Sequence, residues 1–176
     1  MWIESVSPAD ASGELKALYD RIGGARGGIA AIHRAPSLNP KALGAHFELY
    51  KAAMIQPSPL SRSDREALAV AVSRANSCEY SSAHHGQALR KRGLETSLPE
   101  QVFDWAVKLA RVPETVAADD VAVLRAAGLT DRATHSRRDV DGCVFLVYVN
   151  RLVMALWVAL EPGFEATCDP ELHADQ

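Results

Sequence analysis

The chain has 176 residues, of which 48% are apolar and 23% are charged, and its net charge is −3. These proportions indicate one globular domain, not a disordered chain, and the lack of a basic excess argues against a nucleic-acid partner or a membrane-surface anchor. The three cysteines, Cys78, Cys143 and Cys168, are too few for a four-cysteine zinc site, and an odd, small number does not make a disulfide framework. We expect no metal and no other cofactor.

Helix signals begin close to the N-terminus. Ser7 and Pro8 predict a helix start, and the apolar residues that follow at helical spacing are Leu15, Leu18, Tyr19 and Ile22. The glycine-rich stretch 23–28 ends this helix, and we interpret it as a plain loop because no strand precedes it as in a phosphate-binding loop. The first five residues lack a basic segment followed by an apolar one, so we expect no secretory signal and a cytoplasmic location.

Further helix boundaries follow along the chain. A second helix is expected from Asn39-Pro40 to Gln56-Pro57. The third begins near Ser63, because Ser63 and Glu66 have the spacing of a capping box. The remaining predicted boundaries are about Cys78 to Arg92 with Asn76 as N-cap, a start at a Ser97–Glu100 capping box, a stretch through Val121 and Leu124 to Gly128, and a cap at Thr130-Asp131.

The segment from Cys143 to Leu160 is almost wholly apolar and is long enough to span a bilayer. Against a membrane span, Asn150 and Arg151 lie in its middle, where a charge costs about 2.5–3.5 kcal/mol. We therefore expect a buried helix in the core or at a subunit interface. Asn150-Arg151 would line a pocket or meet a carboxylate across the interface, and we favour the interface because buried arginines are usually paired. The β-branched residues 144–149 favour a strand, but no partner strand is evident.

The predicted architecture is all-α, a bundle of roughly seven helices joined by short loops. Residues 1–160 form a single helical domain, and residues 161–176, with their prolines and acids, form a surface tail. The apolar last helix would leave a hydrophobic surface on an isolated monomer, so we expect a homo-oligomer.

The richest chemistry lies around Cys78. On a helix that begins near Asn76, positions 78, 81 and 85 fall within about 60° of one another, so Cys78, Ser81 and His85 share one face. The helix N-terminus would stabilise a Cys78 thiolate, and His85 would exchange its proton. Glu66, on the preceding helix, would orient that histidine if the two helices pack antiparallel.

The spacing of these residues resembles a known motif. Glu66, eleven residues, Cys78, two residues, Ser81, three residues and His85 is similar to the AhpD-like alkyl hydroperoxidase motif, which has a second cysteine at position 81. The flanking stretches 60–66, 76–80 and 83–86 resemble the peroxidase-related branch of the carboxymuconolactone decarboxylase superfamily. The resemblance covers roughly residues 1–160 and implies an AhpD-like helical fold, a homo-oligomer, and a hydroperoxide or other small-molecule substrate.

The resemblance also implies a role for each motif residue. Position 81 matches the cysteine that peroxide attacks, Cys78 matches the partner that closes the disulfide, and Glu66 and His85 match the proton relay. Ser81 cannot be oxidised to a sulfenic acid, so no disulfide forms between positions 78 and 81. Three explanations stay open: a natural loss or change of activity, an engineered substitution, or a single-cysteine mechanism in which an external thiol reduces Cys78.

Three functions follow from these residues. The first is a peroxidase-related antioxidant protein of the peroxiredoxin type, whose hydroperoxide reduction is impaired or altered by Ser81. The second is a cofactor-free lyase or isomerase, like carboxymuconolactone decarboxylase, in which Glu66 and His85 move protons. The third is a helical oligomer that only binds a small ligand or partner.

Simpler roles are open for several residues. Glu66 also fits the capping-box partner of Ser63. His84 and His85 point about 100° apart on a helix, so we expect only His85 to face the site. Tyr80 is expected to be a half-buried aromatic. The histidines without an evident partner are His33, His46, His135 and His173.

Overall fold

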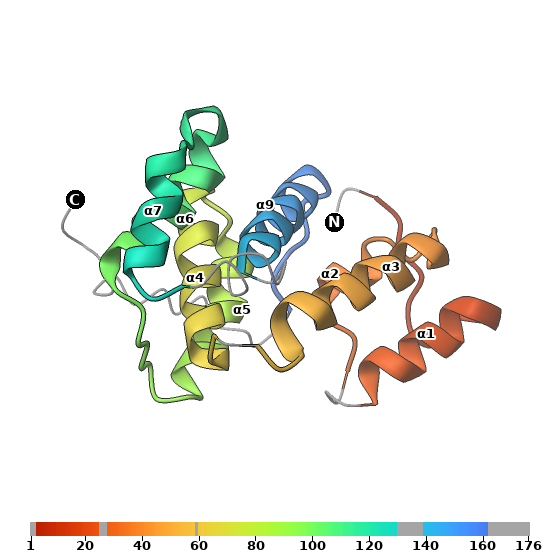
Figure 1. Ribbon diagram of the computed structural model, residues 1–176. Helices are drawn as coiled ribbons and strands as arrows, with labels where there is room; N and C mark the ends of the chain where they lie inside the picture. The colour runs from red at the N-terminus through yellow and green to blue at the C-terminus, as the bar shows by residue number, and fades with distance from the viewer. Residues whose placement is uncertain (1–2, 25–27, 59, 130–138, 162–176) are drawn as a thin grey trace.

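Helices make up all the regular secondary structure in the computed structural model, which describes residues 3–24, 28–58, 60–129 and 139–161. The chain is all-α, as predicted. The α-helices are α1 (Gly13–Gly23), α2 (Ala31–Arg34), α3 (Pro40–Tyr50), α4 (Arg62–Ala75), α5 (Glu79–Arg90), α6 (Glu100–Arg111), α7 (Ala118–Ala126) and α9 (Asp139–Ala155) (Figure 1). A π-helical turn, η1 (Lys51–Ile55), continues α3, and a 3₁₀ turn, η2 (Pro113–Thr115), follows α6.

Helix α4 lies at the centre of the bundle, where it packs against α5, α6 and α9. Figure 1 shows α1, α2 and α3 on one side of α9, and α6 and α7 on the other. The buried apolar side chains form a large cluster across most of these helices and a smaller cluster between α1 and α3. The two helices that carry the predicted motif, α4 and α5, therefore sit in the best-packed part of the molecule.

A tight turn joins α4 to α5. The N–H of Cys78 donates to the carbonyl of Ser73 (2.9 Å), and the N–H of Ser77 donates to that of Arg74 (2.8 Å), the two hydrogen bonds of a Schellman motif. Ser77 has a φ of 54°, the left-handed conformation that this motif requires. The prediction of Asn76 as the N-cap of α5 was wrong: Asn76 ends α4, and Cys78 is the N-cap of α5.

Helix α4 begins at a capping box two residues earlier than predicted. The hydroxyl of Ser61 accepts from the N–H of Asp64 (3.1 Å), and the Asp64 carboxylate accepts from the N–H of Ser61 (3.1 Å). The predicted box of Ser63 and Glu66 has the same spacing, but it does not form because the Glu66 side chain turns into the protein interior.

The loop before α6 is tied to the same carboxylate. Asp64 Oδ1 accepts from the hydroxyl of Thr96 (2.8 Å) and from the N–H of Ser97 (2.9 Å). Because Ser97 is engaged by Asp64, its predicted capping box with Glu100 is absent, and Pro99 is the N-cap of α6 without a side-chain cap.

Three other boundaries differ from the prediction: α1 begins later, the short α2 was not predicted, and α9 ends at Ala155 before the predicted Leu160. Asn39 caps α3 as predicted, with its side chain accepting a backbone N–H. Helix α1 begins at Gly13, because Ser7 and Asp10 close a separate turn ahead of it through side-chain and backbone hydrogen bonds. The predicted cap at Thr130-Asp131 lies outside the described residues.

Helix α9 is the apolar C-terminal segment, and it is helical, not a strand, as expected. Asn150 is fully buried and donates to the hydroxyl of Ser73 (3.2 Å), which fastens α9 to α4. Arg151 is exposed, donates to the carbonyl of Val147 and is not among the residues that line the cavity described below. Its pairing with a carboxylate across a subunit interface stays a prediction. In the part of the chain that the structure describes, no helix combines the length and hydropathy needed to cross a membrane.

Candidate functional site

A cavity of about 540 Å³ opens between two groups of helices. Helices α4 and α5 contribute one set of polar side chains, and α2, α3 and α9 contribute rings and apolar groups. The residues used below that line it are Ile32, His33, His46, Tyr50, Arg62, Glu66, Tyr80, Ser81, His84, His85, Phe145, Leu146, Val149 and Glu161. Its volume lies within the range of about 300–1,000 Å³ that small-molecule sites have.

Glu66 and His85 form the polar centre of this cavity. The Glu66 carboxylate is 0% exposed, and its Oε2 lies 2.7 Å from Nδ1 of His85. Burial raises the pKa of Glu66, but its hydrogen bond and charge interaction with His85 and the Arg62 guanidinium outweigh burial, so the pKa lies below its ordinary value. An ionised carboxylate only accepts hydrogen bonds, so Nδ1 of His85 carries a proton and Nε2 is left to exchange one.

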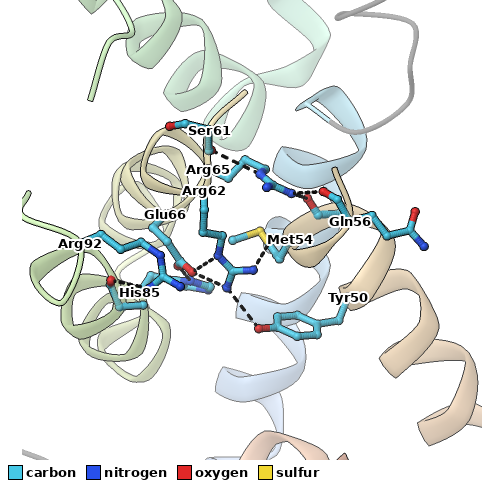
Figure 2. Close-up of polar contacts among 11 residues, drawn as sticks. Tyr50, Met54, Gln56, Ser61, Arg62, Arg65, Glu66, His85 and Arg92 are labelled. Atoms are coloured by element: carbon cyan, nitrogen blue, oxygen red, sulfur yellow. Dashed lines mark hydrogen bonds and ion pairs between the residues drawn. The ribbon is translucent and has the colours of Figure 1, made fainter. Parts of the chain in front are cut away.

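Arg62 holds the second oxygen of Glu66. Its Nε and Nη2 lie 2.7 Å and 2.5 Å from Glu66 Oε1, a two-point contact that fixes the carboxylate in one orientation (Figure 2). Arg62 also donates to the carbonyl of Met54 in η1, and its Nη2 lies 3.5 Å from the Tyr50 hydroxyl. Burial lowers the pKa of Arg62, but the charge of Glu66 and the hydrogen bonds of the guanidinium outweigh burial and raise the pKa above its ordinary value. The guanidinium therefore stays charged.

Arg62 was not predicted as a site residue. Its spacing of four residues before Glu66 is visible in the sequence and is typical of a helical ion pair. Such pairs are usually exposed and weak, so the spacing alone does not distinguish this one. The distinguishing feature is the burial of Glu66, which becomes apparent only when α4 packs against α5 and α9.

Ser81 and Cys78 are both buried at the start of α5, 2% and 1% exposed, with the Cys78 Sγ 3.4 Å from the Ser81 hydroxyl oxygen. Ser81 is among the residues that line the cavity, and Cys78 is not. The group that α5 contributes to the cavity wall at this point is therefore a hydroxyl. Cys143 is buried on α9 away from this cavity, and Cys168 lies outside the described residues.

His84 faces the same cavity as His85, although the helical geometry predicted that only one of them would. The Nε2 of His84 lies 3.0 Å from Glu161 Oε2, and its ring packs on that of Tyr80 with a 4.4 Å centroid separation. The cavity is wide enough to be lined by two sides of α5. Tyr80 is buried, not half-buried, and its hydroxyl lies 3.2 Å from Glu161 Oε1.

Glu161 is the described end of the segment that the sequence assigned to the surface tail. Its Oε1 accepts from the N–H of Ala31 at the start of α2 (2.6 Å). Burial raises the pKa of Glu161, but this backbone bond and the His84 charge outweigh burial and lower it. Glu161 therefore closes the cavity between α2 and α5, a contact across 130 residues that no local pattern indicates.

His33 and His46 are the other functional candidates that the sequence analysis left without a partner. Both are buried, both line the cavity, and their ring centroids are 5.6 Å apart in an edge-to-face arrangement. Burial lowers the pKa of His46, so it is neutral at pH 7. Among the described residues, no group of three histidine, cysteine or carboxylate side chains is placed to hold a metal ion.

Comparison with known families agrees with this geometry. Residues 40–124 match the model of the Carboxymuconolactone decarboxylase family, and this span runs from α3 to α7 with Glu66, Cys78, Ser81 and His85 inside it. Over these residues the chain is similar to that family. The spacing of the four motif residues predicted this similarity.

Solved structures of similar shape support the AhpD-like fold over most of the chain. A peroxidase-related protein from Silicibacter sp. TM1040 is 24% identical, with a TM-score of 0.76 over 86% of each chain. An AhpD-core peroxidase-related protein from Ralstonia eutropha JMP134 is 21% identical, with a TM-score of 0.78 over 93% of each chain. A cysteine-to-alanine variant of the debrominase Bmp8, in complex with 2,3,4-tribromopyrrole, is 13% identical, with a TM-score of 0.72 over 92% of each chain. A search of curated proteins finds no significant match.

Proposed function

We propose that this peroxidase-related AhpD-like protein uses its cavity for proton transfer on a small organic molecule. His85 serves as the base and acid, Glu66 orients it, and reduction of hydroperoxides by a thiol pair at positions 78 and 81 is lost. The observation that carries the proposal is the buried Glu66–His85 pair, 2.7 Å apart, in a cavity whose wall presents Ser81 and not the thiol of Cys78.

The pair has the arrangement that general base catalysis needs. The ionised Glu66 fixes the proton on Nδ1 of His85 and stabilises the imidazolium that forms when Nε2 takes a proton. A carbon next to a carbonyl group is a suitable proton donor, because the electron pair left on the carbon moves to the carbonyl oxygen. Nε2 then returns the proton to the same carbon or to a conjugated one, so the enzyme regains its starting state.

Ser81 is placed to assist this step. Its hydroxyl oxygen accepts from the Cys78 thiol (3.4 Å), which leaves its own hydrogen to donate to a ligand oxygen in the cavity. A donor directed at an oxygen that gains negative charge lowers the barrier, and removing one such donor costs about 2.7–4 kcal/mol in known enzymes. The serine therefore has a chemical role in place of the cysteine of the motif.

A solved relative of the same fold supports an organic substrate. The debrominase Bmp8 structure contains a small halogenated aromatic molecule, 2,3,4-tribromopyrrole. A protein of this shape can therefore hold a compound of about one ring, which agrees with the 540 Å³ cavity of the present chain.

Proton transfer is measured as hydrogen–deuterium exchange in D2O. The exchange is monitored in ¹H NMR as the loss of the signal of a carbon-bound proton. The probes are a β,γ-unsaturated γ-lactone, a cyclic ketone and nitroethane, three compounds with acidic carbon-bound protons. We expect the wild-type protein to accelerate exchange of at least one probe. His85→Gln should lower that rate by about 10²–10⁴-fold, the range of a general base, whereas Cys78→Ser should keep it.

Two results would contradict this function. One is the absence of enzyme-dependent exchange with all three probes. The other is exchange that survives His85→Gln, since the measured rate would then come from another group. Circular dichroism of each variant shows whether the helices are retained, so that a loss of rate is not confused with unfolding.

A second candidate is a single-cysteine thiol peroxidase. Cys78 is the N-cap of α5, where the helix dipole stabilises a thiolate. Hydroperoxide would oxidise that thiolate to a sulfenic acid and leave as an alcohol. One external thiol would then displace water to form a mixed disulfide, and a second would release the Cys78 thiol and an external disulfide. We rank this function second because Cys78 is buried and is not among the residues that line the cavity.

A further inference from the structure

One wall of the cavity consists of rings. His33 from α2, His46 and Tyr50 from α3, and Phe145 from α9 all line it. Their centroids lie 5.6 Å apart for His33 and His46, 5.4 Å for His46 and Phe145, and 6.3 Å for Tyr50 and Phe145. These are the separations of aromatic rings in contact, so the four residues form one continuous surface, which we call the ring wall.

The ring wall and the acid–base pair face one cavity from different helices. Figure 2 shows Tyr50 and His85 approaching from opposite sides, with Arg62 and Glu66 between them. The contact of Arg62 Nη2 with the Tyr50 hydroxyl (3.5 Å) joins the two sides. A ligand held against the ring wall would therefore lie within the same cavity as His85 and Ser81.

Hydrophobic packing alone does not account for the ring wall. His46 is 6% exposed, and its Nδ1 has no hydrogen-bond partner among the described residues. A buried polar atom without a partner is unfavourable, and phenylalanine or leucine would fill the same space without that cost. The imidazole ring therefore has a use that packing does not supply, and the adjacent cavity is the place for it.

Apolar side chains complete the same part of the cavity. Ile32, Leu146 and Val149 also line it, next to the rings. This combination of flat rings and apolar groups favours a flat, unsaturated molecule over a puckered saturated one, because rings gain from stacked and edge contacts beyond the burial of area.

We propose that the ring wall is a substrate subsite for planar, unsaturated ring compounds that carry an oxygen substituent. The subsite holds the plane of the ring, and the oxygen substituent reaches Ser81 and His85. This inference deepens the proposed function, because it names the substrate class of the same cavity.

Binding tests the subsite independently of catalysis. The probes are phenol and cyclohexanol, which share a hydroxyl group and six ring carbons and differ in planarity. Titration of the ¹⁵N-labelled protein by NMR gives both dissociation constants. We expect phenol to bind about 3- to 10-fold more tightly than cyclohexanol, and the residues whose signals shift should include those of the ring wall.

Variants of the ring wall test whether its residues cause the preference for phenol over cyclohexanol. Tyr50→Leu and Phe145→Leu should each reduce the ratio of the two dissociation constants toward one. Tyr148→Leu is the matched control, because Tyr148 contacts His46 and Phe145 at 6.2 Å and 6.5 Å but does not line the cavity. Since Phe145 is a core residue, the half-buried Tyr50 supplies the decisive variant if Phe145→Leu does not fold.

Different results would overturn the ring-wall subsite and the proposed proton transfer. Equal binding of phenol and cyclohexanol to the wild-type protein, or a preference that survives Tyr50→Leu, overturns the subsite. The ring preference should persist in His85→Gln. Loss of deuterium exchange with retained ring preference in that variant supports both proposals, and a wild-type protein that binds phenol without catalysing exchange overturns only the proposed function.

Discussion

Glu66 is held ionised inside the protein by two partners that approach different oxygens. Arg62 contacts Oε1 through two nitrogens, and His85 contacts Oε2. Because one oxygen is fully used by Arg62, the other presents a single acceptor to the imidazole. His85 and Arg62 together keep the carboxylate ionised, and Arg62 also fixes its orientation toward His85.

Replacing Arg62 tests this dependence. Arg62→Gln should raise the pKa of Glu66, because it removes a positive charge from a carboxylate that burial already disfavours. It should also lower the exchange rate about 10- to 100-fold, the effect of losing a hydrogen bond to a charged group of about 1.5–3 kcal/mol. The measurements are the ¹³C titration of the Glu66 carboxyl and the exchange rate between pH 4 and 9.

Arg65 supplies the control on the same helix. It donates to the carbonyls of Ala53 and Gln56 but has no hydrogen bond to Glu66 among the contacts that the structure gives (Figure 2). Arg65→Gln should lower thermal stability and leave the Glu66 titration unchanged. Equal shifts in the two variants would show that Arg62 acts only through the stability of the fold.

The sequence predicted those site residues that lie close to one another along the chain. Glu66, Cys78, Ser81 and His85 lie on two consecutive helices, so their spacing was enough to place them together. His33, His46 and Glu161 join the same cavity from α2, α3 and the end of the α9 segment. Their contacts depend on how helices that are distant in the sequence pack together. Neither the spacing of apolar residues nor the helix-capping residues predict that packing.

At the scale of elements, the hairpin of α4 and α5 positions the site. Three residues, 76–78, separate the end of α4 from the start of α5, and the Schellman turn at Ser77 fixes the register that brings Glu66 to His85. The sequence located this hairpin but misplaced the caps of α4, α5 and α6. The pairs Ser63/Glu66 and Ser97/Glu100 have the right spacing, yet Glu66 and Ser97 are used by tertiary contacts that override the local signal.

Asp64 ties the start of α4 to the loop before α6. Burial raises its pKa, but hydrogen bonds from Ser61, Ser97 and Thr96 outweigh burial and lower it. A lowered pKa means that ionised Asp64 stabilises the fold at pH values above 3.8, its ordinary pKa, and that this stabilisation is lost as pH falls through the lower pKa of the folded state.

Asp64→Asn should therefore destabilise the protein at pH 7 by about 2 kcal/mol, the combined effect of a cap and buried hydrogen bonds. The free energy of unfolding in urea, measured from pH 7 down to pH 3, should show a difference between the proteins that shrinks with acidification. Asp104→Asn, at an exposed position of α6, should stay within about 0.5 kcal/mol of wild type. A constant difference for Asp64→Asn at all pH values would mean that its charge is not involved.

At the scale of the whole molecule, α9 presents apolar side chains outward as well as inward. Val144 and Tyr148, one helical turn apart, are 52% and 50% exposed, and Trp157 beyond the helix is 59% exposed. Apolar residues at this spacing are typical of a surface that packs against another protein. We propose that this face joins copies of the chain in a homo-oligomer.

Light scattering coupled to size-exclusion chromatography tests the oligomer. The wild-type protein should have a mass that is a multiple of the 19.0 kDa chain. Tyr148→Glu should lower that mass, because it places a charge in the proposed interface. Val123→Glu, at a 42% exposed apolar position on α7, should leave the mass unchanged. A wild-type monomer would contradict the proposal.

Position 81 separates the proton relay from thiol chemistry. Ser81→Cys places a thiol on the cavity wall beside Glu66 and His85, with Cys78 directly behind it. Hydroperoxide would convert the new thiol to a sulfenic acid, and Cys78 would displace water from it to form a disulfide that an added dithiol reduces.

The deciding measurement is the rate of cumene hydroperoxide consumption with dithiothreitol as the reductant. We expect no enzyme-dependent consumption by the wild-type protein, catalytic consumption by Ser81→Cys, and loss of the 78–81 disulfide when Cys78→Ser is added. Consumption by the wild-type protein that Cys78→Ser abolishes, or a folded Ser81→Cys variant that shows no turnover, would contradict this expectation.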